Sequence, residues 1–204
     1  MAAGLYRATL EEVLARFGTG SPQRQVVASR LLRIYRVARE TGRLERLIIF
    51  GSFVTTKPDP DDIDIILVMR DDFVFDDCTG ATRKLFEHIE AEQEFGASIS
   101  WIRPALLPLE TLDEFLARWQ IKRDHTRRGI VEVIEMIHDD QELAATQERI
   151  AYFYRLLARL RVTASPSEFS AVAGGYRAET ARMQDEALEY LTRHASEPTP
   201  AEAA

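Results

Sequence analysis

Apolar residues recur along the first two thirds of the chain in two different periods, which predict strands and helices respectively. Short runs of branched apolar residues, bounded by turn-forming or charged residues, predict buried strands at 47–50, 63–69 and 97–102. Apolar residues at helical spacing, with capping residues before them, predict helices at 9–17, 21–41, 79–94 and 111–118.

Two further segments, 119–123 and 129–134, flank a polar turn and are predicted to pair as a β-hairpin. Residues 1–137 are therefore expected to form one α/β (α+β) domain. Its architecture would be a small mixed sheet flanked by helices.

The pattern changes after residue 138. Leu143, Ile150 and Leu157 recur every seven residues and predict a long amphipathic helix over 139–162. A polar break containing Pro166 follows, and Ser167 is expected to cap a second helix, weakened or bent near its start by Gly174-Gly175. Residues 138–195 are thus predicted to be an antiparallel helical hairpin. The Pro/Glu/Ala-rich residues 196–204 are expected to be a disordered tail.

A two-helix hairpin buries little apolar surface by itself, so the stripe on 139–195 predicts a further packing partner. Three partners stay open at this point: the preceding domain, a second copy of the chain, or another protein.

Bulk composition limits the partners further. The net charge of −7 provides no overall attraction to nucleic acid or to an anionic membrane. The single cysteine, Cys78, excludes an internal disulfide and fits a reducing compartment. No run reaches the ~18 apolar residues of a membrane span. A cytoplasmic location is therefore expected.

The densest basic cluster comprises Lys122, Arg123, His125, Arg127 and Arg128. Such a cluster could bind RNA or phosphates. An exposed, solvated turn is the favoured interpretation, because the chain as a whole is acidic.

Candidate chemistry gathers around the first two predicted strands. Gly51-Ser52 ends the first, and Asp62 and Asp64 stand at the start of the second. Side chains two residues apart on a strand share a face, so both carboxylates are expected to point the same way. Such a pair can hold a hard divalent cation against a phosphate. A solvated acidic turn is the alternative, although it leaves Asp64, in an otherwise apolar strand, unexplained.

Gly51-Ser52 after a strand, with Asp62-x-Asp64 at the start of the next, resembles the minimal nucleotidyltransferases of the polymerase-β-like superfamily. The resemblance implies that Gly51 and Ser52 open a short helix whose amides bind the triphosphate of an NTP. It also implies that Asp62 and Asp64 are catalytic and bind Mg²⁺ while an NMP is transferred to an acceptor. Lys57, between the two motifs, is a further nucleotide-binding candidate or simply an exposed lysine.

The chain departs from this family at the third carboxylate, which the strand at 97–102 should provide. Ser98 or Ser100 stands there instead, and a hydroxyl is a poor Mg²⁺ ligand. The alternative is therefore a catalytically degenerate nucleotide-binding or regulatory module that acts through its helical hairpin. Because relatives of this type often form one half of bacterial toxin–antitoxin pairs, the resemblance implies a protein partner.

Overall fold

The computed structural model describes residues 2–107, 110–122, 124–134, 137 and 139–193 of the chain. The chain divides into two compact units. The first comprises Met1–Pro108 with Phe115–Ile134, and the second comprises Leu109–Glu114 with Glu135–Ala204. The predicted disordered tail, 196–204, lies outside the described residues.

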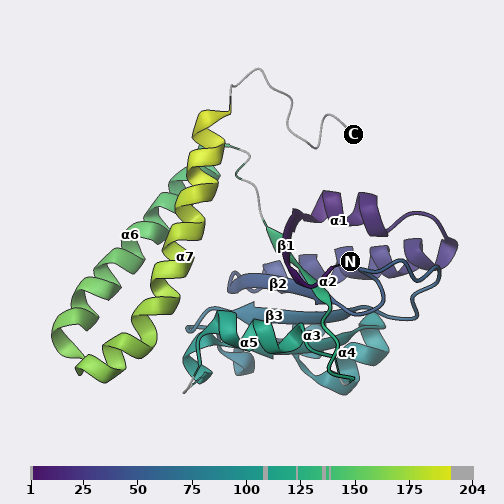
Figure 1. The fold of residues 1–204 in the computed structure, drawn as a ribbon, viewed down its shortest axis with the longest axis horizontal. Helices are drawn as coiled ribbons and strands as arrows, with labels where there is room; N and C mark the ends of the chain where they lie inside the picture. Colours follow the sequence, from purple (N-terminus) through teal and green to yellow (C-terminus); the bar gives the residue numbers. More distant parts are fainter. Residues whose placement is uncertain (1, 108–109, 123, 135–136, 138, 194–204) are drawn as a thin grey trace. The chain divides into compact units, whose positions relative to one another are not determined.

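The first unit contains a mixed five-stranded sheet in the order β1-β5-β2-β3-β4 (Figure 1). Its strands are β1 (Gly4–Thr9), β2 (Leu44–Phe50), β3 (Asp64–Met69), β4 (Ser98–Ile102) and β5 (Gly129–Ile134). β1 and β5 are parallel, as are β3 and β4, whereas β2 runs antiparallel to both of its neighbours. The expected α+β class with a mixed sheet is confirmed, and β2, β3 and β4 are the three strands predicted from apolar runs.

The helices between these strands are α1 (Leu10–Phe17), α2 (Pro22–Glu40), α3 (Gly80–Phe86), α4 (His88–Phe95) and α5 (Leu112–Trp119), with short 3₁₀ turns at Phe75–Asp77 and Pro104–Leu106. The first residues of α5 are counted with the second unit and the remainder with the first. α1 and α2 begin at side-chain caps predicted from the sequence, whereas α3 and α4 have no side-chain cap. Thr9 and Glu12 form a capping box at α1. The Ser21 side chain accepts from the Arg24 amide at α2, where Pro22 occupies the first turn.

One face of the sheet carries the hydrophobic core. Alternate residues of the central strands point to this face, where Ile49 and Ile65 pack in one cluster with Leu31 of α2 and Leu85 of α3. Intervening residues such as Phe50 and Asp64 therefore point to the opposite face.

The predicted hairpin of 119–123 with 129–134 is wrong. Trp119 ends α5, and the first segment keeps one isolated bridge, between Ile121 and Arg127. The second segment is β5, which lies between β1 and β2. Five of its six residues are buried, so its apolar character reflects a position inside the sheet rather than in an exposed hairpin.

The single helix predicted at 79–94 is interrupted at Glu87, whose backbone is extended and separates α3 from α4. The indole Nε1 of Trp101 donates to the Phe86 carbonyl at 3.1 Å. This tertiary bond satisfies a carbonyl at the break that helix continuation would otherwise have paired.

The second unit contains α6 (Asp140–Thr163) and α7 (Pro166–Thr192), which form an antiparallel hairpin (Figure 1). The Phe153 and Tyr176 rings lie 5.5 Å apart, and the Tyr190 hydroxyl donates to Asp140 at 3.0 Å. The expected cap at Ser167 is wrong: Ser165 caps α7 through a capping box with Glu168. The expected weakness at Gly174-Gly175 does not interrupt α7, which stays helical through both residues. Within the described residues, no helix is both long and apolar enough to cross a membrane.

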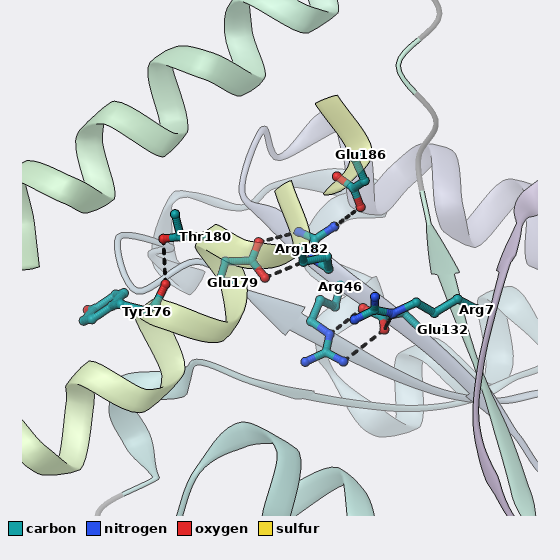
Figure 2. A network of polar contacts seen from close by, with 8 residues as sticks. All are labelled: Arg7, Arg46, Glu132, Tyr176, Glu179, Thr180, Arg182 and Glu186. Carbon is teal, nitrogen blue, oxygen red and sulfur yellow. Dashed lines mark hydrogen bonds and ion pairs between the residues drawn. The ribbon is translucent and has the colours of Figure 1, made fainter. Parts of the chain in front are cut away.

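Each unit holds its own cluster of charged side chains, drawn in Figure 2. In the sheet, Arg46 of β2 contacts Glu132 of β5 through two hydrogen bonds of 2.6 and 3.1 Å, and Arg7 of β1 reaches the same carboxylate at 3.3 Å. Glu132 is only 1% exposed, so Arg46 and Arg7 compensate a buried charge.

The charged cluster of the second unit lies along α7. Arg182 pairs with Glu179 and with Glu186, one turn away on either side (Figure 2). Both ion pairs lie within one helix, and they neutralise the largely buried guanidinium of Arg182.

Candidate functional site

Three strands bring the candidate residues to one end of the sheet. Phe50, the last residue of β2, is the register partner of Asp64, the first residue of β3. Asp64 is in turn the register partner of Ser98, the first residue of β4. Register partners share a face, so Phe50, Asp64 and Ser98 form a row across the face opposite the main core.

Gly51 approaches the Asp64 carboxylate too closely for any side chain to intervene. Its φ is +80°, and a Cβ built on it would lie 1.8 Å from Asp64 Oδ2. Both observations require glycine at this position. Close approach of the Gly51 backbone and the Asp64 carboxylate is therefore part of the native fold.

The burial pattern around Asp62 and Asp64 agrees with the expected common orientation of the two acids. Ile63 and Ile65 between and after them are completely buried in the main core, which directs the two acids the other way. Burial raises the pKa of Asp64, and the negative charge of Asp62 raises it further. The two carboxylates thus repel each other in the absence of a cation.

The segment between the two motifs is held by α2 rather than left as a free loop. Arg24, only 8% exposed, donates to the carbonyls of Phe53, Thr55 and Lys57 at 3.0, 2.7 and 2.5 Å, and also to Phe17 at 2.8 Å. A guanidinium has five donors in a rigid fork, which suits it to bind several carbonyls at once. Arg24 therefore fixes the path of the chain that leads from Gly51 to Asp64.

Further α2 side chains continue this attachment. Ser21 donates to the Pro58 carbonyl at 3.2 Å and Gln23 to the Pro60 carbonyl at 3.1 Å. The acidic, proline-containing segment is thus tied to a helix by its backbone. Its conformation is set before any ligand binds.

The structure of the residues after β2 differs from what the resemblance to nucleotidyltransferases implies. Residues 51–56 form turns, with the Thr55 amide donating to the Ser52 carbonyl at 3.1 Å, whereas a short helix was expected to open at Gly51-Ser52. Lys57, the other nucleotide-binding candidate, is half-exposed and pairs with Asp61 at 2.6 Å.

Ser98 occupies the position expected for the third carboxylate, directly beside Asp64, whereas Ser100 pairs with Ile66 two residues deeper. No group of three His, Cys, Asp or Glu side chains suited to hold a metal occurs among the residues that the structure describes. Glu94, an acid close to the start of β4 in sequence, is paired with Arg33 and Lys84.

Arg128 belongs to this sheet end, although the sequence associated it only with a basic turn. Its Nε donates to the Trp119 carbonyl at 2.8 Å, and its guanidinium lies over the Phe50 ring, 4.5 Å from the centroid. Burial lowers the pKa of Arg128, while the Asp64 charge opposes that change. Only the pairing of β5 with β2 creates this neighbourhood, so no local sequence pattern could have revealed it. Arg123 of the same basic cluster lies outside the described residues.

The fold is α+β, and one end of its sheet carries acidic side chains beside a glycine turn. Residues 1–134 match the model of a family of unknown function, DUF6932, and the chain belongs to that family. The match ends at the last residue of β5, so it contains the whole sheet and every candidate site residue. No curated protein and no solved structure matches the chain.

Proposed function

We propose that this protein is a magnesium-dependent nucleotidyltransferase-like protein that binds an NTP at the sheet end formed by Gly51, Asp62 and Asp64. The observation that carries the proposal is the contact of Asp64 with Gly51. It joins the two halves of the motif, which are separated by a long connector in sequence, into one site.

The side chains at this position fit a magnesium ion. Both acids offer oxygen ligands, which Mg²⁺ prefers, and Ser98 adds a hydroxyl beside Asp64. The raised pKa of Asp64 means that its ionised form is disfavoured in the free protein, and a nearby cation would relieve that cost. Magnesium bound there would neutralise charge on the phosphates and lower the pKa of the attacking hydroxyl.

The residues of the chain have separate tasks in this proposal. Gly51 lets the backbone and the phosphates approach closely because it has no side chain. Ser52 donates its hydroxyl to a phosphate oxygen. Asp62 and Asp64 provide the carboxylates that bind magnesium. Arg24 maintains the geometry of the connector that leads from Gly51 to the two acids.

The same site supports a second candidate function, nucleotide binding without transfer. The specific observation is that Ser98 is in register with Asp64, on the strand that provides a third carboxylate in the polymerase-β-like nucleotidyltransferases that the motif resembles. In this case the chain is a regulatory module, and the α6–α7 hairpin is the surface that contacts a protein partner.

Transfer can be measured directly with α-³²P-labelled NTPs, magnesium and total bacterial RNA or protein as acceptors. Nucleotidyl transfer predicts label on an acceptor with the wild type and none with Asp64→Asn. Binding of NTP without any labelled acceptor would favour the second candidate. Absence of both would contradict the proposal as a whole.

A further inference from the structure

We infer that Arg128 is the phosphate-binding side chain of this site and that it recognises the polyphosphate portion of a nucleotide. The inference rests on the proposed function, which it deepens by naming the group that recognises the anion. It starts from topology, because four separate segments meet at one end of the sheet.

The register of β2 with β5 places Arg128 there. Ile49 pairs with Val131 and Ile48 with Glu132, so continuing this antiparallel register brings the residues before β5 beside the end of β2. Arg128 also has the same parity as Glu132, which places it on the sheet face shared by Phe50 and Asp64. The contact of its guanidinium with the Phe50 ring agrees with both points.

The side chain is preorganised before a ligand arrives. The guanidinium lies over the Phe50 ring, and the hydrogen bond from Nε to the Trp119 carbonyl fixes its direction. The Phe50 ring is itself held by Trp119, 5.0 Å away between centroids. An ordered guanidinium loses less conformational entropy on binding than a mobile one, which favours anion recognition.

Arg128 has hydrogen-bond donors that can bind a phosphate. Nε is used by the Trp119 carbonyl, and among the described residues the two terminal amino groups have no hydrogen-bond partner. Two parallel N–H groups match two oxygens of a phosphate. Asp64 lies near enough to interact electrostatically with Arg128, yet among the described residues the two form no ion pair. A phosphate bound to Arg128 would therefore be adjacent to a cation held by Asp64.

Arg127 provides a matched control. It carries the same charge one residue earlier, is exposed, and pairs through its backbone with Ile121 in an isolated bridge. Removing either arginine changes the net charge equally, so any difference between the two variants reports position rather than overall electrostatics.

The test is isothermal titration of inorganic pyrophosphate and of Mg–NTP into the wild type, Arg128→Gln, Arg128→Lys and Arg127→Gln, with thermal melts to verify folding. We expect Arg128→Gln to weaken both ligands by about 10- to 100-fold, as loss of charged hydrogen bonds does. Arg128→Lys should be intermediate, because it keeps the charge without the fork, and Arg127→Gln should change affinity less than about threefold.

The possible results distinguish the role of Arg128 from the proposed function. Wild-type protein that binds Mg–NTP, with Arg128→Gln and Arg128→Lys binding it equally well, overturns the role of Arg128 and leaves the proposed function standing. Equal losses in Arg128→Gln and Arg127→Gln would also overturn it, since the effect would then be one of net charge. Wild-type protein that binds neither ligand overturns both.

Discussion

Gly51→Ala is the substitution for which the structure makes the sharpest prediction. The new Cβ would lie 1.8 Å from Asp64 Oδ2 and 2.8 Å from its Cγ, so the Asp64 side chain must leave its position. Alanine at a φ of +80° costs about 1–2 kcal/mol relative to glycine. Forcing Asp64 from its rotamer adds about 0.5–1.5 kcal/mol. Destabilisation of about 1.5–3.5 kcal/mol is therefore expected, together with loss of Mg-dependent nucleotide binding.

Gly42→Ala is the matched control. Gly42 has a φ of +62°, and a Cβ there meets nothing within 4 Å, so this variant has the backbone strain without the collision. Urea denaturation should place Gly51→Ala about 0.5–1.5 kcal/mol below Gly42→Ala, the cost of displacing the Asp64 side chain. Titration with Mg–NTP should show that Gly42→Ala binds normally. Equal stabilities, with normal nucleotide binding by Gly51→Ala, would refute the reasoning.

Four further substitutions test other parts of the structure. Glu132→Ala should destabilise the fold by about 3–5 kcal/mol in urea titrations, because it breaks the buried Arg46–Glu132 ion pair inside the sheet. Arg7→Ala, at the half-exposed end, should cost less than about 1 kcal/mol. Ser98→Asp should tighten magnesium binding, measured by titration calorimetry, and lower the melting temperature of the metal-free protein through carboxylate repulsion. Asp64→Asn should be more stable than the wild type at pH 7 in the absence of metal. The folded-state pKa of Asp64 is raised, so ionisation of Asp64 lowers the stability of the wild type as pH rises through that pKa. The stability advantage of Asp64→Asn should be under about 1 kcal/mol and should disappear in thermal melts below about pH 4.

Local patterns predicted the parts of the fold that local chemistry determines. The strands β2 and β3 follow from branched apolar runs, and the capping box at Thr9 marks the start of α1. The closeness of Asp64 to Gly51 agrees with the expected meeting of the two motifs, because both flank the antiparallel pair of β2 and β3.

The parts that sequence reasoning missed depend on contacts between distant segments. β1 has an exposed, weakly apolar pattern and becomes a strand through its pairing with β5, far away in sequence. The break at Glu87 has no proline or glycine to announce it and relies on the Trp101 hydrogen bond. Arg24 lies in a regular helix, yet its guanidinium organises the connector. No periodicity encodes such roles.

Binding of Mg–NTP to the sheet end tests the central claim most directly. Each of the four NTPs should be titrated calorimetrically into the wild type, Asp62→Asn and Asp64→Asn, with magnesium and with EDTA. The account predicts heat of binding for at least one NTP in the wild type with magnesium, its loss in EDTA, and its loss in both folded variants. Nucleotide binding that is unchanged in EDTA or in Asp64→Asn would contradict it, as would a wild type that binds no NTP.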